Sequence, residues 1–364
     1  MASADTSAPA RRLRLRRGTP VLDRGSGTLQ LGSDHRWSLL VSGLSDAERT
    51  WLHEAAAARH GDLEHGAARH RVAPERRARI LRLLADAGFL VPPAAPAASV
   101  RAAAGGAADA PALAALRVDG DGLRTLAGRA RSRVAVVGLG RLGALLAAHL
   151  ATAGVGTVLL DDDSPVQLVD LGVGAYDEVD VGHRRASRLR RRLAEQHPGT
   201  RVATTWRDEA PPDAVVVCTG AGRPEDFARL MSHGIAHLPV VAGEAGLEIG
   251  PFVRPGGTAC MACRFHHDVD ADPDWPRLVG QLAGWALPAG HETVLATTGA
   301  ALATGQVLAH LDGGRPAAAG AVLQVGLPDA LARVRPLSPH PDCGCTAPAP
   351  PPVRRVPATR PAHP

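Results

Sequence analysis

Hydrophobic and polar positions follow two different periods along the first ninety residues of the chain. Between residues 20 and 44, the runs TPVLDRGSGTLQLG and WSLLVSGL alternate around a Gly-Ser-Gly turn and predict two or three short strands. Ser45 then begins a helix, with Glu48 three residues later as in a capping box. A second helix is predicted over residues 74–87, where apolar side chains recur on one side, and Gly88 ends it.

These elements, followed by the apolar run FLVPP, predict a small winged-helix-like (α+β) domain over residues 20–95. Residues 96–112 are almost all Ala, Pro and Gly, the composition of a linker. The arginine-bearing residues 1–19 and the Pro-rich residues 346–364 are predicted to be disordered.

Residues 113–345 have the alternating pattern of an α/β domain. The run RVAVVGLG predicts a buried parallel strand, a helix follows over residues 142–153, and GTVLLDDD predicts the next strand, which together make a βαβ unit. Further helices are expected over residues 184–196 and 292–311. Further strands are expected at RVATTW, DAVVVCTG, PVVAGEAG, LEIGPFVRPG, AAAGAVLQVG and LARVRPLSP. The predicted fold is a Rossmann-like parallel sheet.

A glycine loop joins the first strand of this domain to its helix. Gly138, Gly140 and Gly143 permit a tight turn and a close approach of backbone to phosphate, and the helix start offers free N–H groups. Asp161 ends the next strand, where a carboxylate can bond a ribose hydroxyl. Arg141 stands within the loop and either grips phosphate or fills the pocket. The alternative is a loop that keeps its shape and binds nothing.

Four of the five cysteines form two short chelating pairs. Cys260 and Cys263 make one pair, and Cys343 and Cys345 make the other, about 80 residues later in the chain. Two such pairs supply the four thiolates of a tetrahedral structural zinc site, which leaves no open position for catalysis. The fifth, Cys218, lies in an apolar strand and is expected to be a buried structural cysteine. The neighbouring His266 and His267 are expected on the surface.

Composition removes several classes of function. All 41 basic residues are arginine, so the chain has neither a Schiff-base lysine nor a P-loop lysine. A net charge of +5 with only 3% aromatic residues does not indicate nucleic-acid binding. The sequence suggests neither a membrane-spanning run of about 18 apolar residues nor a secretory signal. A cytoplasmic protein that does not contact membranes is therefore expected.

The motifs of residues 125–345 resemble the ThiF/MoeB superfamily, whose members adenylate the C-terminus of ubiquitin-like proteins. The resemblance rests on VVGLGRLG, GVGTVLLDDD, the DL at Asp170-Leu171, VGHRRA, VVVCTG, LPVVAGEAG and the cysteine pairs. It implies ATP and magnesium, a homodimer and structural zinc. Asp163 and Arg185 then join the glycine loop and Asp161 as candidate nucleotide-binding residues.

Three departures fall on the reactive positions of that family. The family carries an arginine after its NL segment, whereas DLGVGAY has none. The family's lysine falls at Arg185, which keeps the charge but not the donor geometry. The magnesium-binding aspartate of its CTD motif falls on Gly220, which offers no side-chain oxygen. Together these departures argue against ordinary adenylation.

The chain more closely resembles the ThiF-like partner proteins, or cyclodehydratase components, of azole and azoline peptide biosynthesis, as in bacteriocins. In that resemblance the N-terminal domain is a RiPP recognition element that binds the leader of a precursor peptide, and a YcaO enzyme acting in trans cyclises the peptide. The leader is expected to add a strand near Leu29–Leu31. The helix over residues 74–84 would face it with Arg76, Arg77 and Arg79, unless these arginines form only a solvated face.

Two other functions remain open at the level of sequence. An active adenylating enzyme would carry out ATP–pyrophosphate exchange on a peptide or carrier-protein carboxylate and would depend on Asp161. A dinucleotide-dependent oxidoreductase is permitted by the glycine loop. Two features count against it: the cysteine clamp, as we call the four paired cysteines (Cys260, Cys263, Cys343 and Cys345), and the lack of a set of residues suited to hydride transfer.

Overall fold

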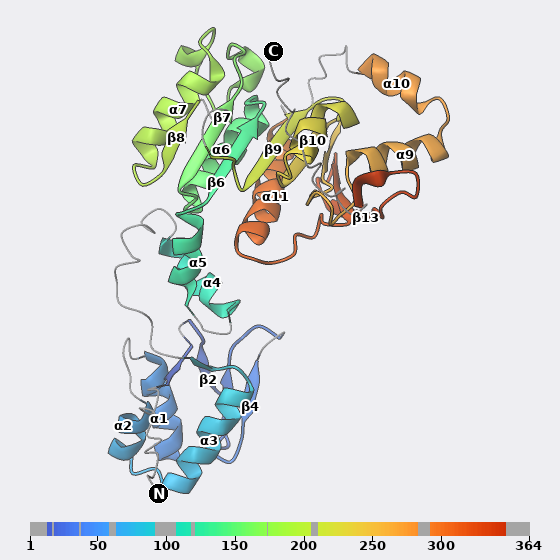
Figure 1. The fold of residues 1–364 in the computed structure, drawn as a ribbon. Helices are drawn as coiled ribbons and strands as arrows, with labels where there is room; N and C mark the ends of the chain where they lie inside the picture. The colour runs from blue at the N-terminus through green and yellow to red at the C-terminus, as the bar shows by residue number, and fades with distance from the viewer. Residues whose placement is uncertain are drawn as a thin grey trace, which may run out of the picture. The chain divides into compact units, whose positions relative to one another are not determined.

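The computed structural model describes residues 13–16, 18–35, 38–57, 63–91, 107–117, 121–172, 174–204, 210–282 and 292–346. The chain divides into two compact units. The first contains residues 1–131 with short pieces at 151–156 and 197–200, and the second contains the remainder. Figure 1 traces both units and labels many of their elements. Most of the two predicted disordered ends and residues 96–106 of the predicted linker lie outside the described residues.

The first unit contains an antiparallel sheet in the order β2-β3-β4. Its strands are β2 (Val21–Asp23), β3 (Leu29–Leu31) and β4 (Leu39–Val41). Leu29 and Leu31 of β3 are fully buried because they alternate toward the core. The prediction that Leu29–Leu31 would accept an added strand was wrong, because β3 pairs on both sides. Among the described residues, the strands of this sheet with an open side are β2 and β4.

Three helices cover the inner face of this sheet: α1 (Asp46–Ala57), α2 (Leu63–Arg69) and α3 (Pro74–Asp86). The capping box predicted at the start of α1 is present, since Ser45 N donates to Glu48 Oε2 over 2.8 Å and Glu48 N donates to Ser45 Oγ over 3.3 Å. Trp51 anchors the core at 1% exposure, and its indole nitrogen donates to the Leu63 carbonyl at the start of α2.

Residues 13–16 differ from the expectation of disorder. Arg14–Leu15 form β1, which pairs antiparallel with β5 (Leu90–Val91). Leu15 is 6% exposed and belongs to the core of the unit, while Arg16 N donates to the Phe89 carbonyl. The local sequence RLRLRR alternates with the period of a strand, and burial of its second leucine fixes the segment.

The end of the predicted linker is also ordered. A 3-10 turn, η2 (Ala107–Asp109), leads into α4 (Ala110–Ala115), and α5 (Gly122–Arg129) follows. Alanine favours helix, so an Ala-rich stretch folds where a neighbouring helix covers it. Gly122 permits the close contact of α4 with α5, since a Cβ there would lie 2.0 Å from the Ala110 carbonyl oxygen.

The second unit is built on an eight-stranded sheet in the order β13-β12-β11-β10-β9-β6-β7-β8. The five strands from β10 to β8 are parallel, and the three at the other end are antiparallel. The strands are β6 (Arg133–Val137), β7 (Thr157–Asp161), β8 (Arg201–Ala203), β9 (Ala214–Thr219), β10 (His237–Ala242), β11 (Gly246–Ile249), β12 (Ala321–Gly326) and β13 (Ala332–Pro336). The central strands are runs of buried Val, Leu and Ala, as expected for a sheet covered on both faces. The predicted α/β fold class is confirmed.

Six α-helices are described in this unit, with four 3-10 turns. The helices are α6 (Arg141–Thr152), α7 (Arg185–Gln196), α8 (Ala228–Ser232), α9 (Met261–Ala271), α10 (Trp275–Leu282) and α11 (Thr293–Leu311). The turns are η3 (Leu168–Asp170), η4 (Glu178–Asp180), η5 (Pro224–Phe227) and η6 (Gly344–Thr346). The predicted helices at α6, α7 and α11 are present, whereas α8, α9 and α10 were not foreseen.

Helix α11 is long and apolar enough to cross a membrane by length and composition, which the sequence analysis did not expect. Its buried residues include Leu295, Ala300 and Val307, and the helix contacts β10, β11 and β12. A helix that places small residues against a sheet is typical of a core helix, so we assign α11 to the core.

Candidate functional site

Strand order reverses between β6 and β9, and the loops that follow these two strands meet there. In open parallel sheets this crevice is the usual ligand site. The glycine loop leaves β6 at Gly138, which has φ of +81°. A Cβ on Gly138 would lie 2.4 Å from the Cys218 carbonyl oxygen at the end of β9, and a Cβ on Gly143 would lie 2.0 Å from the Gly138 carbonyl oxygen. Both glycines are therefore required for packing, whether or not a ligand binds.

The remaining loop residues begin α6. The Gly140 carbonyl accepts from Ala144 N over 2.9 Å in the first turn of the helix. Cys218 packs against Gly138 and Gly143 of the loop, and burial raises the pKa of its thiol to about 12. A thiol in that state is not a nucleophile near neutral pH, which agrees with the structural role expected for it.

A carboxylate already occupies part of the loop's hydrogen-bonding capacity. Asp162 Oδ2 accepts from Leu139 N over 2.7 Å, and Asp162 Oδ1 accepts from Ser164 N over 2.8 Å. Burial alone would raise the pKa of Asp162, but the backbone N–H groups of Leu139 and Ser164 and the charge of Arg185 outweigh it and lower the pKa. Asp162 is thus an ionised carboxylate at the place where loop N–H groups of this kind bind phosphate.

Arg185, the first residue of α7, is held by two carboxylates. Its Nη1 lies 3.1 Å from Asp162 Oδ2, its Nη2 lies 2.7 Å from Asp170 Oδ2, and its Nε donates to the same Asp170 oxygen over 2.8 Å. The side chains of Asp162 and Asp170 are 7% and 0% exposed. The charge of Arg185 is therefore neutralised inside the protein, as expected for a buried ion pair of good geometry.

Tyr176 completes this network. Its hydroxyl donates to the Leu139 carbonyl over 2.8 Å, and burial raises the pKa of the phenol so that it stays protonated. The backbone of Leu139 is consequently held at both ends, by Asp162 at its nitrogen and by Tyr176 at its carbonyl oxygen.

The other predicted nucleotide-binding residues, Asp161, Arg141 and Asp163, have different partners and different exposure. Asp161 ends β7, and its backbone carbonyl accepts from Gly138 N over 3.0 Å. Arg141 Nη2 donates to Thr293 Oγ1 at the start of α11 over 3.1 Å. A Cβ on Gly172 would lie 2.5 Å from Arg141 Nε, so the guanidinium rests on that glycine. Asp163 points outward with a side chain that is 91% exposed and pairs with Arg184.

Sequence reasoning missed Asp162, Asp170 and Tyr176 as partners in this site. The run of three acids at the end of β7 was visible, but the assignment of one acid to the loop needs the direction of each side chain. Asp170 is separated by 15 residues from Arg185, and the folded loop between β7 and α7 brings them together.

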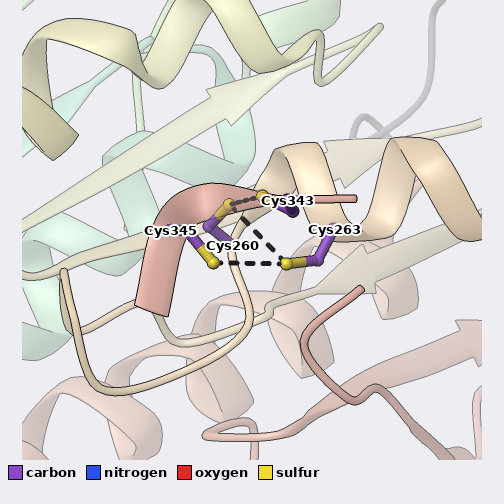
Figure 2. Close-up of side chains that lie close together, drawn as sticks. All are labelled: Cys260, Cys263, Cys343 and Cys345. Carbon is purple, nitrogen blue, oxygen red and sulfur yellow. Dashed lines mark hydrogen bonds between the residues drawn. The ribbon is translucent and has the colours of Figure 1, made fainter. Parts of the chain in front are cut away.

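The four cysteines predicted as metal ligands come together from two distant segments. Cys260 and Cys263 stand at the start of α9, and Cys343 and Cys345 stand at η6 (Figure 2). Their sulfurs are 4.0 Å apart for Cys260–Cys263, 3.7 Å for Cys260–Cys343 and 3.3 Å for Cys263–Cys345, and all four lie within 4.8 Å of one another.

These distances fit a single tetrahedral ion. Four sulfurs at about 2.3 Å from zinc would be separated by about 3.8 Å, which lies inside the observed range. Burial raises the pKa of Cys343 to about 11, and a divalent ion would displace the proton that this sulfur otherwise keeps. The residues present therefore suit a closed, structural metal site, and zinc stays the predicted ion.

A cavity of about 590 Å³ opens beside Gly220, at the ends of β9, β10 and β12. Its wall combines apolar side chains, such as Trp275 and Leu331, with the carboxylates of Glu244 and Asp329. A concave surface that mixes apolar walls with a few charged groups suits a peptide or another small organic ligand.

A sequence model of the ThiF family matches residues 114–221. Among solved structures, the E. coli protein MccB bound to ATP superimposes with a TM-score of 0.66 at 15% identity, covering 92% of this chain and 99% of that chain. The microcin C7 biosynthetic enzyme MccB in complex with N-formylated MccA gives the same four values. PaaA gives a TM-score of 0.66 at 16% identity, covering 88% of this chain and 99% of that chain. No protein with a curated description matches the sequence.

Proposed function

Because this chain carries a ThiF-family domain, we propose that it is a ThiF-like partner protein that binds the leader of a ribosomally made precursor peptide. It presents that peptide to a YcaO-type cyclodehydratase, which forms the azoline rings. The ThiF-like unit supplies the scaffold and does not adenylate the peptide itself.

One observation carries the proposal. Arg185 falls at about the position of the lysine that the family carries near the start of this helix, and here Asp162 and Asp170 neutralise it at distances of 2.7–3.1 Å. A triphosphate that approached this arginine would have to displace two buried carboxylates and would meet their negative charge. Arg185 therefore contributes little to the binding of a triphosphate.

Two absences in the sequence point the same way. The segment after Asp170-Leu171 lacks the family's arginine, and Gly220 stands where the magnesium-binding aspartate would be. Magnesium takes hard oxygen ligands and usually holds the phosphates through one or two carboxylates. A site without that carboxylate and with a neutralised cation has lost both ways of stabilising a leaving pyrophosphate.

The first unit offers a surface for the leader at β4. Among the described residues β4 pairs with β3 alone, so its outer edge is open to a further strand. Arg76 Nη2 donates to the Gly43 carbonyl just after β4, and Arg76 Nε donates to Glu48. These bonds hold the start of α3 against the end of β4, so a peptide that adds to β4 would run beside α3.

The arginines of α3 divide into two groups. Arg76 pairs with Glu48, and Arg77 pairs with Glu64, so these two arginines form ion pairs within the first unit. Arg79 and Arg82 are exposed, and Leu83, four residues after Arg79 and so on the same side of the helix, is 41% exposed. This exposed strip, which we call the α3 strip (Arg79, Arg82 and Leu83), suits an acidic leader that also carries an apolar residue.

The leader surface can be tested by charge reversal. The variant Arg79→Glu/Arg82→Glu is expected to bind a synthetic leader from a neighbouring precursor gene about tenfold more weakly at low salt, and the loss should shrink as salt rises. Isothermal titration calorimetry on the full chain measures the change. The matched control is Arg190→Glu on α7, which is exposed in the second unit. Equal affinity in both variants would contradict the assignment of the surface.

The second candidate is an active adenylating enzyme. The observation that favours it is the likeness in fold to MccB, a protein whose structures contain ATP and, separately, N-formylated MccA. Calorimetric titration with ATP and magnesium, together with ATP–pyrophosphate exchange in the presence of the precursor, separates the two functions. Our proposal predicts no exchange by this chain alone, and a rate of exchange that Asp161→Ala abolishes would overturn it.

The same proposal includes a cytoplasmic homodimer. In its described residues, the loop between β7 and α7 exposes large apolar side chains, with Leu168 74% exposed and Val179 73% exposed, alongside Val169 and Val181. A surface group of this kind suits a protein partner, and a second copy of the chain would cover it.

A further inference from the structure

A second group of metal-type ligands lies beside the cysteine clamp. His267 and Asp270 stand three residues apart on α9 and therefore on the same side of that helix. His340 comes from the segment that leads into Cys343. One ligand atom from each of these three residues lies within 4.8 Å of the other two. We propose that His267, Asp270 and His340 bind a second divalent ion, of the zinc, cobalt or nickel class.

The donor set suits this class of ion. Two imidazole nitrogens and one carboxylate oxygen are preferred by late first-row divalent metals, whereas calcium and magnesium take oxygen ligands alone. The three residues are contributed by the same helix and the same returning segment that hold the thiolates. The two sites would therefore fasten one pair of chain segments at two points.

His267 is held so that one nitrogen remains a ligand. Its Nε2 lies 3.1 Å from the Ser338 carbonyl oxygen, which can only accept, so Nε2 carries the ring proton. Nδ1 is then the nitrogen with the free lone pair. A backbone carbonyl that fixes the tautomer in this way is the usual outer partner of a metal-binding histidine.

His340 is the most enclosed of the three ligands, with only 5% exposure. Its ring stacks on His266 at a centroid distance of 5.0 Å and meets the edge of His267 at 4.8 Å. His266 and His267 are half-buried by these contacts, which corrects the expectation that they are surface residues. These two ring contacts fix the orientation of the His340 ring, as a metal site requires.

The protons at this cluster can rearrange to admit an ion. Without an ion, His340 Nδ1 accepts from Asp342 N over 3.1 Å, so Nε2 carries the proton and donates to Asp270 Oδ2 over 3.0 Å. An ion that binds Nε2 takes the place of this proton, and a ring protonated at Nδ1 gives up the hydrogen bond from Asp342 N. The Asp342 carboxylate, whose Oδ2 lies 3.9 Å from Nδ1, would have to move closer to accept that proton.

The proposed site is open, unlike the cysteine clamp. The Asp270 side chain is 69% exposed, so solvent reaches the cluster. Three protein ligands leave a fourth tetrahedral position for water, whereas four thiolates leave none. The second ion should therefore exchange faster and bind more weakly than the first.

Metal counting tests this site without any assay of activity. Full-length protein without a polyhistidine tag is dialysed to equilibrium against a known concentration of Co²⁺, and the metal bound per chain is measured by mass spectrometry as the excess over the outer buffer. We expect about two ions per chain, with strong thiolate-to-cobalt bands from the clamp and weaker bands from a nitrogen and oxygen site. The variants His267→Gln and Asp270→Asn are expected to retain about one ion per chain and the full thiolate bands.

His35→Gln provides the matched control. His35 is a 95% exposed histidine with an aspartate oxygen 3.9 Å away, so it tests whether any surface His–Asp pair binds the ion. Its metal content should equal that of the wild type. Because the Asp270 side chain is exposed, Asp270→Asn keeps the test valid if His267→Gln fails to fold. A wild-type protein that saturates at about one ion, or variants that keep about two, would overturn the proposal.

Discussion

At the scale of the residue, Arg185 is the side chain whose loss should cost most stability. Replacement by alanine leaves Asp162 and Asp170 buried and close together without a cation, and removing one partner of a buried ion pair costs about 3–5 kcal/mol. We expect Arg185→Ala to lower the free energy of unfolding in urea by that amount. Arg190→Ala, at an exposed position on the same helix, should change it by less than about 0.5 kcal/mol. An equal loss of unfolding free energy in the two variants would mean that the ion-pair network contributes no stability.

The same network predicts how stability depends on pH. The pKa of Asp162 is lowered from its ordinary value of 3.8 in the folded protein, whereas the unfolded chain titrates near that value. The stabilisation is therefore fully present above the ordinary value and is lost as the pH falls through the lowered pKa. Asp162→Asn should be less stable than the wild type at neutral pH, and the difference should shrink in acid. Urea unfolding at a series of pH values measures it, and a constant difference would contradict the assignment.

At the scale of the element, the cysteine clamp fastens α9 to η6. Cys343→Ser removes one ligand and is expected to release the ion. A loss of about 3 kcal/mol would lower the midpoint of thermal unfolding by about 10 °C, because a domain of this size shifts by roughly 2–4 °C per kcal/mol. Calorimetry together with a zinc count measures both effects. Cys218→Ala, outside the clamp, should keep its zinc, and a Cys343→Ser variant with full metal content would exclude this ligand set.

The elements that the sequence predicted are those with a strong local signal. The glycine loop with its strand and helix, the capping box at Ser45 and the run of α11 each depend on residues within one or two turns of one another. The two-residue strand β1 was missed because β5, the strand with which it pairs among the described residues, lies about 75 residues away in the chain. Helix α4 was missed because alanine and proline composition resembles a linker until another helix covers it.

The candidate site was predictable in its ligands but not in its charges. Cysteine spacing identified the four thiolates, since chelating pairs are visible in one dimension. The pairing of Arg185 with Asp170 depends on how the loop between β7 and α7 folds, and His340 meets Asp270 only after a return of 70 residues. Sequence spacing does not show which distant segments fold back against each other. The Arg185–Asp170 pair and the His340–Asp270 pair therefore became visible only in the structure.

At the scale of the whole molecule, the loop between β7 and α7 decides the oligomeric state that we propose. Val166 N donates to the His183 carbonyl and Gly182 N donates to the Val166 carbonyl, which closes the loop on itself. The capping boxes at Asp170 and Asp180 then hold its two turns, η3 and η4. Exposed apolar side chains on such a braced loop keep a fixed surface, which suits an interface between two identical chains.

Substitution of that surface should separate the copies without unfolding them. We expect the wild type to elute as a dimer and Leu168→Asp/Val179→Asp to elute as a monomer, because both side chains are more than 70% exposed and their replacement costs the isolated chain little. Size-exclusion chromatography with light scattering measures the mass. Leu278→Asp, at a leucine on α10 that is 42% exposed, is the matched control and should remain dimeric. A monomeric wild type, or a double variant that stays dimeric, would place the interface elsewhere or remove it.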